Sequence, residues 1–146
     1  MSLHDKLQQA MMEKINSQKE EGAAFLAANK SKEGIQELEG GMQYQVLQEG
    51  TGGASPKVNS NIRAHYAGAL LNGKEFDSSY KRGQPFEARV NQLIKGWQVA
   101  LPMMTEGSKW RLWIPSDLGY GDRGAGAGIP GGATLVFDIE LIKILD

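Results

Sequence analysis

The first 29 residues repeat apolar residues at a helical spacing. The segment Leu3–Asn29 contains no proline, and apolar residues recur in it every four positions: Leu3, Leu7, Met11 and Ile15. Residues spaced in this way fall on one side of an α-helix. The sequence therefore predicts a helix over residues 3–29 with one narrow apolar stripe. Gly22 weakens this helix by about 1 kcal/mol relative to alanine, and Gly34 offers a stop signal.

A stripe this narrow does not fold a helix by itself. Two interpretations follow from it. In the first, the helix packs on its own domain or is simply solvated. In the second, it meets a partner helix or a further N-terminal portion of the protein. The pattern does not choose between them.

From Gly40 onward, apolar and polar residues alternate in short runs. The clearest runs are residues 42–47 (MQYQVL), 62–70 (IRAHYAGAL), 110–115 (WRLWIP) and 134–141 (TLVFDIEL). Alternation with a period of two is typical of antiparallel strands with one buried face. Asn72-Gly73 is a pair favoured in tight hairpins. Only one further helix is expected, around residues 93–101, because Pro102 prevents its extension. The sequence therefore predicts an α+β domain in which one short helix covers the sheet.

The glycine-rich segment before the last strand raises the question of a nucleotide site. Gly119, Gly121 and Gly124 match the dinucleotide-binding pattern GxGxxG. That pattern needs a helix directly after it, whose N-terminus meets the pyrophosphate. Here more glycines, Pro130 and a strand follow, so we reject a nucleotide site. The segment is better explained as a long flap with Ile129-Pro130 at its tip.

Composition narrows the classes of partner and chemistry. With 16 basic and 17 acidic residues, the net charge of -1 gives no reason to expect nucleic acid or an anionic membrane. No apolar run approaches the roughly 20 residues of a membrane span, and the first thirty residues lack the apolar core of a signal peptide. The absence of cysteine excludes thiolate chemistry and suits both cytosol and periplasm. We therefore expect a soluble protein of the cytoplasm or the periplasm.

Side chains typical of metal or nucleophilic catalysis are scarce. His4 and His65 are far apart in sequence, and no metal-binding or serine-nucleophile motif is present. No metal and no cofactor are expected. The unusual feature is a set of aromatic residues on the predicted strands, short helix and flap: Tyr66, Phe76, Tyr80, Phe86, Trp97, Tyr120 and Phe137. Each ring alone suits a core, but together they predict a lined pocket.

Three ordered segments containing these aromatics resemble a known family. They are residues 65–87 (HYAGALLNGKEFDSSYKRGQPFE), 93–115 (LIKGWQVALPMMTEGSKWRLWIP) and 118–144 (LGYGDRGAGAGIPGGATLVFDIELIKI). They resemble the FK506-binding (FKBP) type of peptidyl-prolyl cis-trans isomerase, and the similarity covers about two thirds of the chain. Residues 23–52 resemble the segment that joins dimerisation helices to the isomerase domain in the bacterial macrophage-infectivity-potentiator and FKBP22-like branch.

The resemblance implies a fold and an activity. The fold is an antiparallel sheet of five to six strands wrapped around one short helix and preceded by an N-terminal helix. Residues 1–35 would be a helical extension from a truncated dimerisation region, and residues 36–146 the isomerase domain. The activity is rotation of X-Pro bonds in peptides and unfolded proteins, which assists folding without a cofactor. Implied partners are proline-containing clients, macrolides like FK506 or rapamycin as inhibitors, and a second copy through the N-terminal helices.

The resemblance also implies a role for each site residue. Four are assigned to catalysis: Asp77, Tyr66, Tyr120 and Phe76. Seven are assigned to substrate binding: Phe86, Leu93, Ile94, Trp97, Ile129, Phe137 and Arg82. In this assignment Trp97 forms the pocket floor and Tyr120 donates a hydrogen bond to a ligand carbonyl. Arg82 holds Asp77 by an ion pair, and Asp77 either contacts the rotating bond or organises Tyr66 and Arg82.

The chain departs from the family pattern in the flap. Ala125 stands where other members often carry histidine, and Gly131-Gly132 follows Pro130 where a second proline is common. These departures concern flap stiffness and the preference for the residue before proline. An alternative function is a binding module or holdase chaperone, which keeps the pocket, has little catalytic activity and uses the N-terminal helix as a grasping arm.

Overall fold

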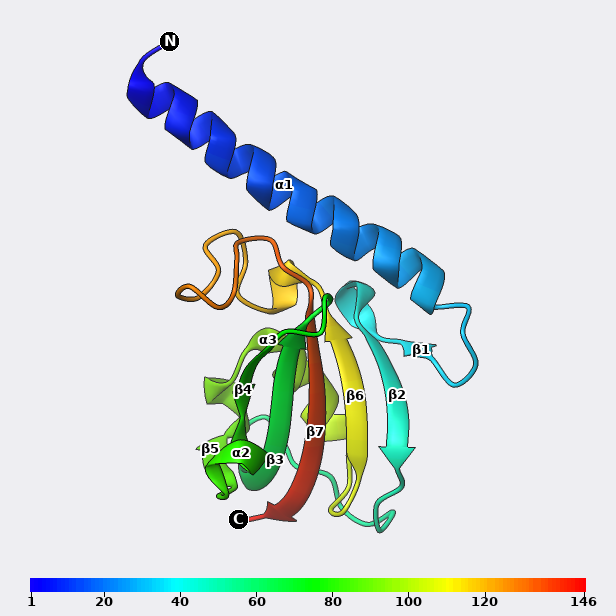
Figure 1. The fold of residues 1–146 in the computed structure, drawn as a ribbon. Coiled ribbons are helices and arrows are strands. Elements are labelled where there is room, and N and C mark those ends of the chain that lie inside the picture. The colour runs from blue at the N-terminus through cyan, green and yellow to red at the C-terminus, as the bar shows by residue number, and fades with distance from the viewer.

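One antiparallel sheet forms the body of the protein (Figure 1). The computed structural model describes all residues from 1 to 146. Its strands are β1 (Gln36–Glu37), β2 (Gln43–Gln48), β3 (Asn61–Leu70), β4 (Glu75–Ser78), β5 (Phe86–Arg89), β6 (Lys109–Ile114) and β7 (Leu135–Ile144). The spatial order is β1-β2-β6-β7-β3-β4, and β5 also pairs with β3. The helices are α1 (Leu3–Asn29), α2 (Ser79–Arg82) and α3 (Lys95–Ala100).

Strand β3 organises the sheet because it has partners on both edges. It pairs with β7 along one edge over nearly its whole length. On the other edge its first half pairs with β5, where Ala64 faces Phe86, and its second half pairs with β4, where Gly68 faces Asp77. Residues of β4, β5 and β7 are thereby brought beside Tyr66 of β3.

Helix α3 packs against the inner face of the curved sheet. Trp97 and Ala100 of α3 are buried in the same hydrophobic core as Leu112 and Ile139 of the sheet. The helix approaches closely because residue 96 is glycine, where a Cβ atom would stand only 2.8 Å from Ile114 Cδ1. Close packing of this kind fixes the position of Trp97.

The predicted class is confirmed, with two differences in detail. The one-turn helix α2 was not expected, because four residues are too few to show a helical period. The sheet contains seven strands, against the five to six expected. One of the additional strands is β1, which has only two residues and pairs with β2 at the edge of the sheet. So short a strand has no room for the alternation that identifies a strand in sequence. Helix α1 covers the predicted range, and α3 ends at Ala100, where a 3-10 turn over Leu101–Met103 that contains Pro102 begins.

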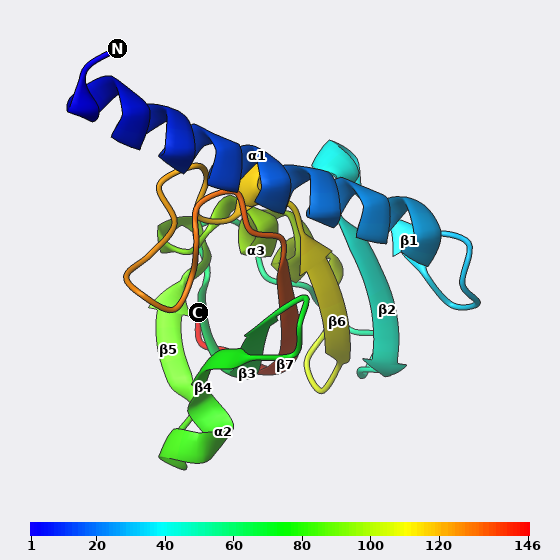
Figure 2. The same ribbon diagram turned by 45° about the horizontal axis from the view of Figure 1, so that its top comes forward.

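Helix α1 lies across one end of the sheet and over the glycine-rich flap, residues 119–133 (Figure 2). Ser2 and Asp5 cap its start reciprocally. Its second half is tied to the domain through the buried Asn29 side chain, whose amide donates to Gln43 Oε1 at 2.8 Å, while Gln43 Nε2 donates to Leu26 O at 2.8 Å. The second half of the helix therefore packs on its own domain.

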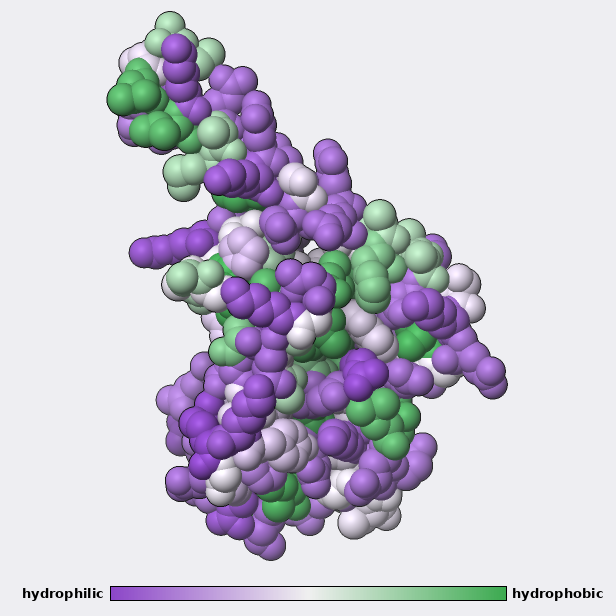
Figure 3. Space-filling view, in the orientation of Figure 1, coloured by the Kyte–Doolittle hydropathy of each residue, from purple (hydrophilic) through white to green (hydrophobic).

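The first half of α1 projects beyond the domain. Leu3, Leu7 and Met11 remain 74%, 58% and 62% exposed, and Figure 3 shows apolar side chains gathered at this free end. These three residues of the stripe are therefore largely uncovered by the rest of the chain, whereas Ile15 lies against Gly131 and Gly132. None of the helices combines the length and the apolar character that crossing a bilayer requires.

Candidate active site

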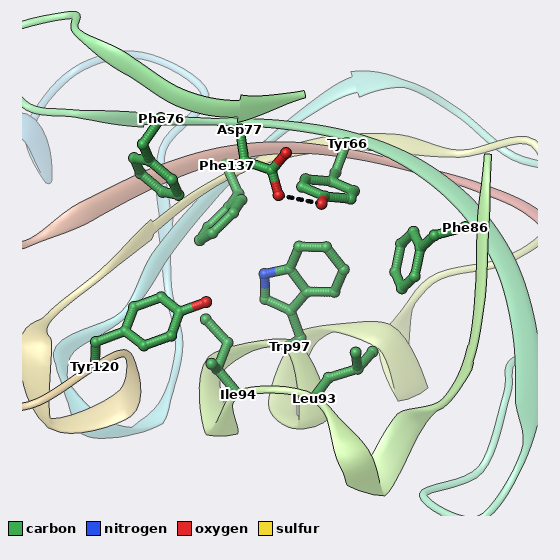
Figure 4. A pocket seen from close by; sticks show the side chains of 9 residues that line it. All are labelled: Tyr66, Phe76, Asp77, Phe86, Leu93, Ile94, Trp97, Tyr120 and Phe137. Atoms are coloured by element: carbon green, nitrogen blue, oxygen red, sulfur yellow. Dashed lines mark hydrogen bonds between the residues drawn. The ribbon is translucent and has the colours of Figure 1, made fainter. Parts of the chain in front are cut away.

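A hollow of about 230 Å³ opens between the inner face of the sheet, α3 and the start of the flap. Figure 4 shows its walls. Nine side chains line it, all but one hydrophobic: Tyr66, Phe76, Asp77, Phe86, Leu93, Ile94, Trp97, Tyr120 and Phe137. The cavity is thus an apolar pocket with a single charged group, which suits an apolar ligand carrying few polar atoms.

The indole of Trp97 forms the floor of the pocket. It is 4% exposed and is surrounded by rings, with centroid distances of 5.3 Å to Tyr66, 5.5 Å to Phe86 and 5.2 Å to Phe137. The contacts with Tyr66 and Phe137 are edge to face, which is a favourable aromatic geometry. Nε1 of Trp97 is buried without a hydrogen-bond partner in the chain. The floor is therefore rigid, and it carries one free N–H donor.

Gly68 of β3 makes room for the pocket rings. A Cβ atom at this position would stand 2.6 Å from Cε1 of Phe137 and 2.8 Å from Cζ of Phe76. Glycine in the middle of a strand often marks such a close approach. The pocket depends on this absent side chain as much as on the rings themselves, a point that the sequence analysis missed.

Asp77, Tyr66 and Arg82 form a hydrogen-bonded network at the rim. The Tyr66 hydroxyl donates to Oδ2 of Asp77, and Nη1 of Arg82 donates to Oδ1. Arg82 Nη2 also donates to the Tyr66 hydroxyl at 3.1 Å, and its guanidinium lies 5.6 Å from the Tyr66 ring centroid. Both carboxylate oxygens of Asp77 therefore have partners within the chain.

The network keeps Asp77 charged and Tyr66 neutral. Burial alone raises the pKa of Asp77, but the hydrogen bonds from Tyr66 and Arg82 and the charge of Arg82 outweigh burial and lower its pKa. Burial and the hydrogen bond to Asp77 raise the pKa of Tyr66 above its ordinary value. Tyr66 therefore remains a hydrogen-bond donor at neutral pH.

Tyr120 brings a second hydroxyl to the pocket from the start of the flap. Its side chain is 38% exposed, and Figure 4 shows its oxygen directed toward the cavity. No group of the chain is hydrogen-bonded to this oxygen. Burial and the nearby charge of Asp77 raise the pKa of Tyr120, so the hydroxyl is protonated at neutral pH. A ligand carbonyl in the pocket would find a free donor here.

Two of the eleven predicted site residues do not line the cavity. Arg82 lies behind Asp77 as its ion-pair partner, in the position implied by the resemblance. Ile129 is 6% exposed and belongs to the hydrophobic core, and its backbone pairs with Ala125 at the tip of the flap. Ile129 is therefore not among the residues that line the cavity, and its expected part in substrate binding stays a prediction.

Tyr80 also lies outside the pocket, contrary to its inclusion in the aromatic set. It belongs to α2, where its ring stacks on His65 at 4.5 Å and its hydroxyl donates to Glu140 Oε1 at 2.7 Å. The chain turns into α2 directly after Ser78, so Tyr80 leaves the inner face of the sheet. A pattern of single aromatic residues does not reveal such a turn.

Ser79 supports the site and was not found from sequence. Its buried hydroxyl accepts a hydrogen bond from the backbone N–H of Tyr66 at 2.7 Å and lies 2.8 Å from His65 Nδ1. It thereby fixes the backbone that carries Tyr66. No sequence signal distinguishes Ser79 from Ser78. No group of three or more His, Asp or Glu side chains gathers where it could hold a metal ion.

Comparisons with known families agree with this geometry. The profile described as FKBP-type peptidyl-prolyl cis-trans isomerase matches residues 52–142. A second profile, described as the domain amino terminal to FKBP-type peptidyl-prolyl isomerase, matches residues 1–46. Together they account for nearly the whole chain.

Individual relatives in sequence are named as isomerases of the same type. The chain is 44% identical to the FKBP-type 22 kDa peptidyl-prolyl cis-trans isomerase of Escherichia coli over 98% of this chain and 69% of that protein. It is 46% identical to the peptidyl-prolyl cis-trans isomerase Mip of Coxiella burnetii over 86% of this chain and 54% of that protein. It thus spans only about half the length of the Coxiella relative.

A solved structure resembles the whole arrangement. The crystal structure of FkpA from Escherichia coli superposes with a TM-score of 0.88 at 36% identity, covering 94% of this chain and 63% of that chain. Its match includes α1 as well as the sheet, because 94% of the chain cannot be covered without the helix. The chain belongs to the FKBP-type peptidyl-prolyl cis-trans isomerase family, in the branch that contains Mip and FkpA.

Proposed function

We propose that the pocket above Trp97 catalyses cis-trans isomerisation of X-Pro bonds in peptides and unfolded proteins. The observation that carries the proposal is the pocket itself. Eight hydrophobic side chains and one charged network surround a cavity of about 230 Å³, which is large enough to hold a proline ring. The substrate in this proposal is a segment of polypeptide that places its proline ring in the cavity.

The chemistry follows from the electronic structure of the amide. Rotation of an X-Pro bond is opposed by a barrier of about 20 kcal/mol, which arises from conjugation of the nitrogen lone pair with the carbonyl. The planar amide has more charge separation than the twisted transition state and is better solvated by water. A dry, apolar pocket therefore destabilises the planar form more than the twisted form. Each 1.36 kcal/mol of this difference raises the rate tenfold.

Each group of pocket residues has its own role in the proposed catalysis. Trp97, Phe86 and Phe137 hold the proline ring in the dry part of the pocket. Tyr120 donates a hydrogen bond to a carbonyl next to the rotating X-Pro bond, so that one flank of the peptide is held while the other turns. Leu93 and Ile94 close the edge of the floor next to α3. The reaction then needs no nucleophile and no general acid.

Asp77 acts by organising the pocket in this proposal. Its two oxygens are occupied by Tyr66 and Arg82, which argues against direct attack on the rotating carbonyl carbon. Its charge instead orients the Tyr66 hydroxyl and anchors Arg82 over the Tyr66 ring. Phe76, the residue before Asp77, packs edge to face on Phe137 at 5.6 Å and extends the wall.

The decisive experiment compares two tryptophan variants. Trp97→Leu removes the pocket floor, whereas Trp113→Leu removes a buried indole that does not line the pocket. Isomerisation of a short X-Pro peptide is followed by NMR exchange spectroscopy. We expect Trp97→Leu to lower kcat/KM by about tenfold or more, and folded Trp113→Leu to retain activity. A wild-type chain that does not accelerate the reaction would refute the proposal.

A second candidate function, binding of unfolded chains without turnover, draws on the exposed stripe of α1. Leu3, Leu7 and Met11 offer an apolar surface outside the pocket. If this stripe holds clients, replacing its three residues by serine abolishes protection in an aggregation assay and leaves peptide isomerisation intact. Trp97→Leu has the opposite pattern. Loss of both activities in one variant would argue against two separate surfaces.

The same stripe suits a second copy of the chain, and we propose a homodimer through the first half of α1. Apolar residues four apart on an exposed helix pack readily against an identical helix. Analytical ultracentrifugation is expected to give a dimer for the wild-type chain and a monomer for the triple serine variant. The predicted location, cytoplasm or periplasm, is tested by fractionation of cells that produce the full-length protein.

A further inference from the structure

The flap is closed at both ends by backbone hydrogen bonds. At its stem, Gly132 N–H donates to Gly121 O at 2.9 Å. At its tip, Ala125 and Ile129 exchange two hydrogen bonds of 2.9 and 3.2 Å. Tyr120 stands immediately before the stem. Any movement of the stem therefore changes the place of the Tyr120 hydroxyl in the pocket.

Helix α1 contacts both arms of this stem. On one arm, Nζ of Lys19 lies 2.6 Å from Oδ1 of Asp122. On the other arm, Ile15 lies against Gly131 and Gly132. Residues 15 and 19 are neighbours on one face of a helix, since they are four positions apart. One face of α1 thus spans the stem, as its position over the flap in Figure 2 illustrates.

The approach of α1 to the stem is close enough to require glycine. A Cβ atom on Gly132 would stand 2.5 Å from Ile15 O and 3.2 Å from Cγ of Lys19, and one on Gly131 would overlap the backbone of Asp122. Gly132 also has φ of +80°, which side-chain-bearing residues rarely adopt. The glycine pair after Pro130 therefore lets the helix rest directly on the flap backbone.

The contact lies next to the residues that bind substrate. Asp122 is two residues from Tyr120, and Gly124 N–H donates to Tyr120 O at 3.1 Å. The Tyr120 hydroxyl has no partner within the chain to hold its direction. The position of the Tyr120 hydroxyl is set by the backbone of the stem, and Lys19 and Ile15 of α1 hold the stem in place.

We propose that Lys19 and Ile15 of α1 are positioning residues for the isomerase site, which hold the flap stem so that Tyr120 faces the pocket. This inference rests on the proposed function. It concerns residues far from the cavity, and it assigns the helix a part in the reaction within one chain. Neither residue touches the substrate.

The test uses full-length variants. Lys19→Ala removes the ion pair, and Lys19→Asp with Asp122→Lys restores it in reverse. Lys6→Ala is the matched control, because Lys6 is exposed on α1 and forms no ion pair. We expect Lys19→Ala to lower kcat/KM by about two- to fivefold, as fits a half-exposed pair. The reversed pair should recover most of the loss, and Lys6→Ala should have no effect.

Two further readouts separate positioning from a general loss of stability. Hydrogen exchange at the amides of Ala125, Ile129 and Gly132 should accelerate in Lys19→Ala and not in Lys6→Ala. High salt screens the ion pair, so it should lower the activity of the wild-type chain toward that of Lys19→Ala, which itself should respond little. Ile15→Ala should speed exchange at the same amides, with Met12→Ala, which is 47% exposed and outside the apolar stripe, as its control.

The outcomes are distinct. Flap exchange and kcat/KM of Lys19→Ala equal to those of Lys6→Ala would overturn the proposal, and so would reduced activity with unchanged flap exchange. If the wild-type chain proves inactive while Lys19→Ala still speeds exchange in the flap, the proposed function is wrong and the clamp on the flap stands.

Discussion

Gly22 of α1 lies so close to Thr134 that a Cβ atom at residue 22 would overlap Oγ1 of that threonine. Thr134 directly precedes β7, and Gly22 is one of two buried residues of the helix. The glycine that weakens α1 as an isolated helix therefore lets it dock on the sheet. Helix propensity and packing act in opposite directions at this position.

Gly22→Ala tests which effect is larger. Helix propensity alone would stabilise the chain by about 1 kcal/mol. We expect a net loss of about 1–3 kcal/mol instead, because the added methyl group has no space. The free energy of unfolding is measured with urea. In a Thr134→Ala background most of this loss should disappear, and a stabilising Gly22→Ala in the wild-type background would contradict the packing described here.

Gly68→Ala should damage the pocket while leaving the fold in place. The methyl group would push the rings of Phe76 and Phe137 into the cavity, so we expect a higher KM for X-Pro peptides and at least about a tenfold fall in kcat/KM. Ala67→Ser, on the opposite face of β3, is the control. Peptide kinetics and thermal unfolding of both variants distinguish a blocked pocket from an unfolded chain.

Acid should weaken the rim through Asp77. Its pKa in the folded chain lies below its ordinary value of 3.8. A carboxylate with a lowered pKa stabilises the fold fully above pH 3.8, and this stabilisation is lost as the pH falls through the lower, folded value. Activity should be level from about pH 5 to pH 8, where Asp77 stays charged. In Asp77→Asn the acid-sensitive part of the stability should be smaller, and an identical acid profile would contradict this role.

Asn29 should anchor α1 to β2. Asn29→Ala removes the donor to the buried Gln43 side chain, and an unsatisfied buried polar group costs about 1–3 kcal/mol. Urea unfolding should show a loss in this range. Asn16→Ala, at an exposed position of the same helix, should change stability by no more than about 0.5 kcal/mol. Equal effects of the two changes would argue against the buried contact.

Periodicity predicted most of the fold because most of its elements have one buried face. The apolar spacing of α1 and the alternation in β2, β3, β6 and β7 directly reflect which side chains face the interior. β4 and β5 have four residues each, and a pattern of period two is hardly visible in so few positions. Their presence follows from pairing with β3, which is a property of the folded sheet.

The aromatic set predicted that a lined pocket exists, but only the resemblance assigned individual residues to its floor and walls. Aromatic residues such as Trp97 and Phe137 stood out, but their types do not say which rings meet. Tyr80 illustrates the limit, because it carries the same signal and lies on the other side of β3. The contacts between α1 and the domain could not be predicted from the apolar spacing, because Lys19 and Asn29 attach the helix through polar side chains.

The place of β7 in the sheet has a consequence for how the protein is made. This strand lies between β3 and β6, and a ribosome synthesises it after both. Until β7 emerges, the edges of β3 and β6 that it will cover are open and can pair with other chains. The hydrophobic core is incomplete during this time. The sheet must therefore close late, through contacts between distant parts of the sequence, which is the slow class of folding reaction. The nascent chain therefore passes through a form in which two strand edges are open.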